Sequence, residues 1–225
     1  MSILLILEPF LFFSEQGYSS IRKIQTTVAI AKQHGMKVLF DEIRSGAFST
    51  GSFLFTQKCM PVDVDFLCFS KGLALGVPTA VLAIKSGILS QNIIKKEDRL
   101  KSCMSTSEVA MQRANDLIDY YLSNTVSFNE QMAQTTERII NHFSPFSNYS
   151  FVENVNIMGL CCVFVFNRNI KKTRLKLIWT YMISKGIEVR HHEDNLWFLS
   201  FAIDSTDEEL VRVKNALEEA MKLIK

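Results

Sequence analysis

The chain has 225 residues, of which 48% are apolar and 21% are charged, and its formal net charge is +2. This composition excludes a disordered chain, and the length is enough to bury a substantial core in one or two domains. Lys and Arg are scattered rather than clustered, so the sequence predicts no nucleic-acid partner.

The first half of the chain alternates apolar runs with a helical stripe, which is the pattern of an α/β domain. Apolar residues at Ile21, Ile24 and Val28 predict a helix over residues 18–34, and Gly35 supplies its C-terminal cap. Right-handed crossovers between the strands are expected. The strands predicted from continuous apolar runs are residues 3–7, 37–40, 66–70 and 79–84.

The second half begins with two predicted helices, from an apolar stripe over residues 109–121 and from residues 129–143. Residues 144–150, which contain Pro, Ser and Asn, predict a loop, so we expect domains at 1–147 and 148–225. The second domain is expected to be a small α+β unit, whose last helix starts at the capping box Thr206–Glu209. Its other predicted elements are strands 160–166, 187–190 and 196–203 and a helix over about 173–185.

Cysteine usage and hydropathy indicate the compartment. The five cysteines have no CxxC spacing, and Cys68, Cys161 and Cys162 lie in apolar runs, which favours a reducing cytoplasm. The N-terminal apolar stretch lacks a basic start and contains Glu8 and Pro9, unlike a signal peptide. No run reaches the roughly 18 apolar residues of a membrane helix. We therefore expect a soluble cytoplasmic protein with no membrane partner.

Two chemistry-bearing residues each close a predicted strand. Asp41 follows the run 38–40, and Lys71 follows the run 66–70. In open α/β sheets, ligands bind beyond the carboxyl ends of the strands. An acidic partner for the ring nitrogen and a lysine for the carbonyl carbon are the protein groups that pyridoxal 5'-phosphate (PLP) requires. Asp41 and Lys71 are thus the candidate catalytic pair. Residues 191–194 lack the spacing of a ligand set, so no metal site is predicted there.

Four landmarks in order carry a family resemblance. Residues 40–51 (FDEIRSGAFSTG) and residues 69–78 (FSKGLALGVP) resemble the two signatures of class III aminotransferases. Glu8-Pro9 and residues 156–160 are similar to two further strand segments of that family. The resemblance implies the fold type I of aspartate aminotransferase. In this chain that means part of a PLP-binding large domain, with a mostly parallel sheet and helices, followed by the small C-terminal domain.

The resemblance also implies roles for the site residues. Asp41 would keep the pyridine nitrogen of PLP protonated, and Lys71 would form the Schiff base and move a proton during amino transfer. A lysine in that role must reach its neutral form, which partial burial favours. The substrates implied are a small-molecule amino donor and an oxo acid or aldehyde acceptor.

Three further positions are candidate cofactor ligands. Glu42 would position the cofactor, or it is a solvated loop carboxylate. Arg44 would approach the cofactor or substrate, or it has a surface role. Thr106 stands where the family has a hydroxyl that reaches the phosphate from the neighbouring subunit. The alternative for Thr106 is a helix start, with residues 105–108 forming a capping box.

The sequence also departs from the family pattern. Ser49 stands where the family has an arginine, and the N-terminal half of a family member is not represented. Three readings stay open: an aminotransferase that acts as a homodimer or with a complementary N-terminal half, a non-catalytic remnant that acts as an association partner, and an unrelated α/β binding domain. Within the enzymes, a glutamate-semialdehyde type of aminomutase is compatible with the same residues.

Overall fold

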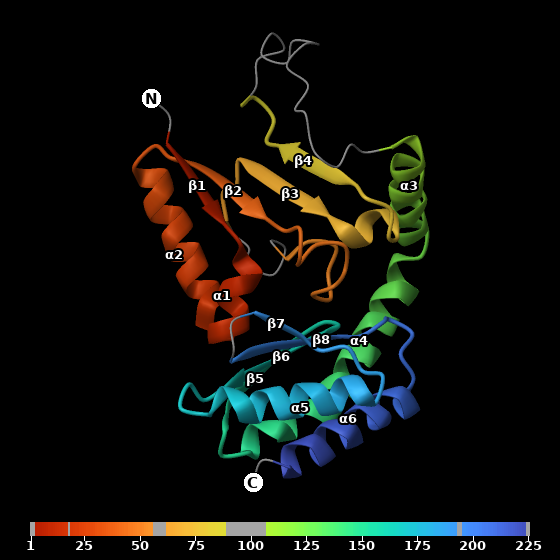
Figure 1. Ribbon diagram of the computed structural model, residues 1–225. Coiled ribbons are helices and arrows are strands. Elements are labelled where there is room, and N and C mark those ends of the chain that lie inside the picture. The colour runs from red at the N-terminus through yellow and green to blue at the C-terminus, as the bar shows by residue number, and fades with distance from the viewer. Residues whose placement is uncertain (1–2, 18, 56–61, 89–106, 193–194, 224–225) are drawn as a thin grey trace. The chain divides into compact units, whose positions relative to one another are not determined.

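The chain forms two compact units (Figure 1) in a computed structural model that describes residues 3–17, 19–55, 62–88, 107–192 and 195–223. The first unit contains Met1–Phe13 and Tyr18–Thr125, and the second contains Ser14–Gly17 and Val126–Lys225. The sequence places a domain boundary between residues 147 and 148. That boundary stays a prediction about which segments fold independently.

The first unit is built on a four-stranded mixed sheet in the order β1-β2-β3-β4. β1 and β2 are parallel, β2 and β3 are parallel, and β4 runs antiparallel to β3. The predicted α/β class with a mostly parallel sheet is confirmed. The elements are β1 (Leu4–Leu7), α1 (Pro9–Gln16), whose last turn is assigned to the second unit, α2 (Ser19–Gln33), β2 (Lys37–Asp41), β3 (Phe66–Ser70), η2 (Lys71–Ala74), β4 (Ala80–Ile84) and α3 (Glu108–Ser123).

Helix α2 packs against the sheet along the stripe that the sequence predicts. Ile24, Val28 and Ala31 are buried, and they recur at the spacing of one helical face. In β2, Val38 and Phe40 are fully buried, and they alternate with half-buried residues as a strand requires. Gly35 adopts φ 69° directly after the helix, so it is the left-handed cap that the sequence indicates.

The second unit has a four-stranded antiparallel sheet in the order β5-β6-β8-β7. All six residues of β6 are buried, which explains its continuous apolar sequence. Gly159, at φ 57°, lies in the turn between β5 and β6. The elements are α4 (Thr125–Phe143), η3 (Ser144–Asn148), β5 (Val152–Met158), β6 (Cys161–Phe166), α5 (Lys172–Ser184), β7 (Arg190–His192), β8 (Leu196–Ser200) and α6 (Asp207–Lys222).

The structure differs from the sequence prediction in several elements and boundaries. The sequence pattern does not predict helix α1, although Pro9 at its first position is a common helix start. Strand β5 was not predicted over its full length, because exposed polar residues such as Glu153 and Asn154 interrupt its apolar pattern. β7 begins at Arg190 rather than residue 187, and the buried residues Ile187 and Val189 lie before the strand. Within the described ranges, no helix is long and apolar enough to cross a membrane.

A buried carboxylate ties α2 to the sheet. Asp65 is only 3% exposed, and it accepts hydrogen bonds from the ammonium of Lys32, from Lys37 at 3.3 Å and from the backbone N–H of Val38 at 2.8 Å. Burial by itself raises the pKa of Asp65. The hydrogen bonds from Lys32 and Val38 and the positive charge of Lys32 outweigh burial, so the pKa is lowered overall.

Replacing Asp65 by Asn should reduce the free energy of unfolding by about 2 kcal/mol near neutral pH, because two lysines lose their carboxylate. The pKa of Asp65 is lower in the folded than in the unfolded state. Its contribution is therefore complete above the ordinary value of 3.8 and is lost as the pH falls through the folded-state pKa. Urea unfolding followed by far-ultraviolet circular dichroism, at neutral pH and in acid, measures both effects.

The matched control is Asp63→Asn, because Asp63 also pairs with Lys32 but its side chain is 53% exposed. Its cost should stay below about 1 kcal/mol, since solvent screens an exposed pair. Equal costs for the two variants, or a difference between wild type and Asp65→Asn that grows in acid, would contradict the assignment.

Candidate functional site

Asp41 is the last residue of β2, at the carboxyl end of the strand. Its Oδ1 accepts the backbone N–H of Ile43 at 3.0 Å, which fixes the side chain at the start of the following loop. Its neighbour in the sheet is Cys68 of β3. Burial raises the pKa of the Cys68 thiol, and the negative charge of Asp41 raises it further. The carboxylate of Asp41 therefore lies at the strand end, as the sequence predicts.

Lys71 directly follows β3 and is the first residue of η2. Its backbone adopts φ 47°, a left-handed conformation that is unusual for a residue with a side chain. Residues before and after Lys71 hold this turn. The Ser70 hydroxyl donates a hydrogen bond to the carbonyl of Thr79, and the Leu73 side chain is buried. The Lys71 side chain is exposed. The partial burial expected for this amine is therefore not supplied by the residues that the structure describes.

The topology brings Asp41 and Lys71 to one edge of the sheet. β2 and β3 are adjacent and parallel, so their carboxyl ends lie together. Figure 1 shows both strands pointing towards the same edge, where the chain leaves β3 into η2. The two catalytic candidates, which are 30 residues apart in the sequence, thus flank the position where a ligand would bind to an open α/β sheet.

Glu42 anchors the loop after β2. It is completely buried, and its Oε2 accepts the backbone N–H of Phe55 and the Ser45 hydroxyl, the latter at 3.5 Å. These contacts exclude the alternative of a solvated loop carboxylate. They describe a residue that shapes the loop beside Asp41. Direct contact between Glu42 and a cofactor stays a prediction.

Of the other two candidate cofactor ligands, the structure describes Arg44 but not Thr106. Arg44 is half-buried, and its Nη1 lies 3.4 Å from Oε1 of Glu8, which follows β1. This ion pair connects the loop to the end of the neighbouring strand, a contact that the sequence did not indicate. Direct binding of cofactor by Arg44 stays a prediction. Thr106 lies outside the described residues.

An aromatic cluster packs against the loop that follows β2. Phe48 lies 4.7 Å from Tyr121 and 5.4 Å from Phe53 between ring centroids, and Phe53 packs edge-on against Phe69 of β3 at 6.0 Å. Tyr121 belongs to α3, so this cluster joins the loop, the sheet and a helix. Leu73 of η2 is buried in the same apolar core, next to Ala114.

Residues with strained backbone conformations lie in the segments that follow β2 and β3. Four residues other than glycine have positive φ within the described ranges, and all of them lie in the two segments that follow β2 and β3. Such conformations persist only where packing enforces them, and they are common at functional sites. The four residues are Ala47 (52°), Phe48 (68°), Lys71 (47°) and Leu75 (50°). Ala47 also disfavours a larger residue at position 72, because a Cβ added at Gly72 would lie 3.2 Å from the Ala47 Cβ.

The chemistry of these side chains fits the ring nitrogen and the carbonyl carbon of PLP. A carboxylate that already accepts one hydrogen bond still has acceptor capacity for a protonated ring nitrogen. An exposed primary amine on a fixed turn can approach a carbonyl carbon. Both groups belong to the first unit and start from rigid strand ends.

The chain belongs to the class-III aminotransferases, because the model of that family matches residues 5–221. Enzymes of this class depend on PLP. The chain is also similar to the adenosylmethionine-8-amino-7-oxononanoate aminotransferase of Helicobacter pylori, with 26% identity over 189 residues, which is 80% of this chain and 43% of that protein.

Solved structures give the same fold. The adenosylmethionine-8-amino-7-oxononanoate aminotransferase of Methanocaldococcus jannaschii superimposes with a TM-score of 0.76 at 18% identity, covering 99% of this chain and 54% of that one. The ornithine aminotransferase of Plasmodium yoelii superimposes with a TM-score of 0.74 at 17% identity, covering 100% of this chain and 57% of that one. The chain therefore spans about half the length of the relatives that it matches.

Replacing Glu42 by Ala should reduce the free energy of unfolding by about 1–3 kcal/mol, because the buried N–H of Phe55 loses its carboxylate acceptor. The loop should also open more often, so the Phe55 amide should exchange with solvent faster. Urea unfolding and amide hydrogen exchange measure the two effects.

Glu8→Ala is the matched control for this loop. It removes a carboxylate from the Arg44 pair, in which both side chains are about a third exposed, so its cost should stay below about 1 kcal/mol. Unchanged exchange at Phe55 in Glu42→Ala would show that Glu42 does not hold the loop.

Proposed function

We propose that this chain carries the catalytic residues of a PLP-dependent aminotransferase and transfers an amino group between an amine or amino acid and an oxo acid or aldehyde. The observation that carries the proposal is the placement of Asp41 and Lys71 at the carboxyl ends of two adjacent parallel strands. Membership of the class-III aminotransferases supports the reaction class.

Each residue has a defined task in this proposal. Bound PLP supplies an electron sink for the carbon that carries the substrate's amino group. The Asp41 carboxylate holds a proton on the ring nitrogen, and the hydrogen bond from Ile43 N–H keeps that carboxylate oriented. Lys71 would hold the cofactor at its carbonyl carbon through Nζ, and the same amine would move a proton to and from the substrate carbon. Arg44 and Thr106 are the further candidates for cofactor contacts.

The supporting residues act through geometry. Glu42 fixes the loop that follows Asp41, and the aromatic cluster of Phe48, Phe53 and Tyr121 holds that loop on α3. A rigid loop keeps Asp41 and Lys71 at a constant separation, which is what catalysis by positioned groups requires. The two domains, 1–147 and 148–225, and assembly as a homodimer or with a complementary N-terminal half complete the proposal.

The test is to incubate the full chain with PLP, record the absorbance spectrum, reduce with borohydride and map the modified lysine by mass spectrometry. We expect a band distinct from that of free PLP, with the label on Lys71. Lys71→Arg should abolish the band and the label at this position. Lys23→Arg, an exposed lysine on α2, is the matched control and should leave both unchanged.

A second step separates catalysis from binding. Amino donors added before reduction should convert bound PLP to pyridoxamine phosphate, which chromatography detects. Label on Lys71 without any conversion across a panel of donors would favour the non-catalytic association partner. Label distributed evenly over surface lysines would refute the proposal.

A further inference from the structure

A cavity in the second unit is lined by aromatic, apolar and basic side chains, as small-molecule sites often are. It has a volume of about 250 Å³ and lies between α5 and strands β7 and β8. Its lining contains none of the candidate catalytic or cofactor residues, and it belongs wholly to the second unit. The lining residues are Lys172, Leu175, Lys176, Trp179, His191 and Trp197.

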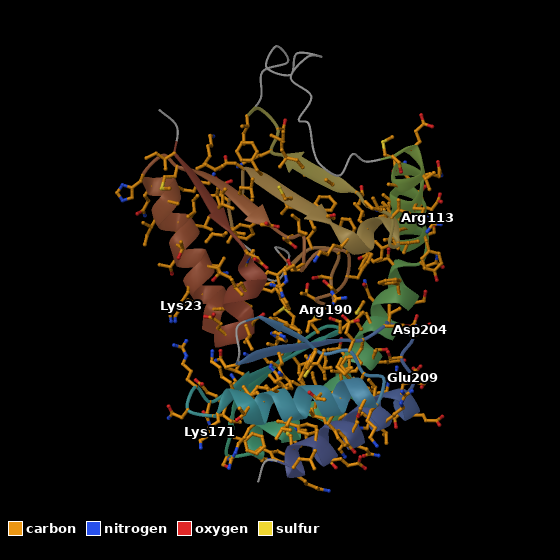
Figure 2. The ribbon with its side chains drawn as sticks, in the orientation of Figure 1. Lys23, Arg113, Lys171, Arg190, Asp204 and Glu209 are labelled. Atoms are coloured by element: carbon orange, nitrogen blue, oxygen red, sulfur yellow. The ribbon has the colours of Figure 1, made fainter. Side chains whose placement is uncertain are left out.

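One face of helix α5 forms one wall. Lys172, Leu175, Lys176 and Trp179 follow one another at the i, i+3, i+4 and i+7 spacing, so they share a helical face. Leu175 is buried, whereas both lysines are exposed. Lys171 in Figure 2 marks the residue just before this helix.

Aromatic rings from the strands and from α5 complete the lining and make specific contacts. His191 and Trp197 are directly paired across β7 and β8, so their side chains lie on the same face of the sheet. Trp197 is 3% exposed and packs edge-on against Phe166 at 4.9 Å. The Trp179 indole donates to the carbonyl of Val189 at 3.1 Å and lies edge-on to His191 at 6.2 Å. These contacts fix the orientation of both indoles.

The described residues that line the cavity bring positive charge to it. Among the described residues that line it, two carry an amine and none carries a carboxylate. Lys176 makes no ion pair with a carboxylate among the residues that the structure describes. The site therefore combines flat apolar rings with positive charge at one helical face.

We propose that this cavity binds a planar aromatic ligand that carries an anionic group, with the ring against Trp179 and the small accessible part of Trp197 and the anion at Lys172 and Lys176. Aromatic rings stack on fixed indoles at low entropic cost, and ammonium groups form charge-assisted hydrogen bonds with carboxylate or phosphate oxygens. The volume suits a ligand of one or two rings rather than a large cofactor.

The chain offers a direct reporter, because it contains two tryptophans and both line this cavity. Titration of the full chain with phenyl phosphate, followed by tryptophan fluorescence, should show a saturable change. Benzyl alcohol, which keeps the ring, and inorganic phosphate, which keeps the anion, should give no saturation over the same range. A parallel titration with adenosine monophosphate distinguishes a nucleotide from a single-ring acid, and saturation by either supports the proposal.

The double variant Lys172→Gln/Lys176→Gln should raise the dissociation constant for phenyl phosphate about tenfold, because two charge-assisted contacts are lost. Lys214→Gln/Lys222→Gln removes two amines from α6 instead and is the matched control, for which we expect no change. Far-ultraviolet circular dichroism verifies that all variants are folded. Equal affinity of wild type and the Lys172/Lys176 variant, equal affinity for benzyl alcohol and phenyl phosphate, or no saturation with either anionic probe would overturn the proposal.

Discussion

Parallel pairing of β2 with β3 is the constraint on which the candidate site depends. It places the carboxyl ends of two strands at one edge of the sheet, so a carboxylate and an amine that are far apart in the sequence come to the same edge. Antiparallel pairing of the same segments would put Asp41 and Lys71 at opposite edges. The buried Asp65 supports this arrangement, because it accepts the Val38 N–H of β2 while it binds the ammonium of Lys32 on α2.

The loops beyond these strands depend on side chains rather than on repeated backbone pairing. Glu42 is buried in the loop between β2 and β3, and Phe48, Phe53 and Tyr121 fix that loop to α3. The left-handed conformations of Ala47 and Phe48 occur in the loop that this packing holds. An apolar cluster that contains neither catalytic candidate therefore holds the loop that follows Asp41.

The second unit has a different organisation. Its antiparallel sheet buries β6 completely, and its edge strand β7 leaves room beside α5 for a cavity lined by both tryptophans of the chain. The aromatic residues around Phe166 thus pack against one another, whereas Trp179 lines the cavity for which a ligand is proposed. The ligand proposed there is separate in its residues from the cofactor proposed at Lys71.

The sequence by itself determined the α/β class, most strands and helices, and the two strand-end residues. Apolar periodicity and the residues that end helices and strands are local features, which can be read without knowing the tertiary contacts. Tertiary structure decided what those patterns do not encode. Helix α1 and the full length of β5 depend on packing that overrides a weak local pattern. The Glu8–Arg44 pair, the contacts of Glu42 and the cavity of Trp179 and Trp197 join segments that are distant in the chain. Such contacts follow from strand order and register, which local propensity does not specify.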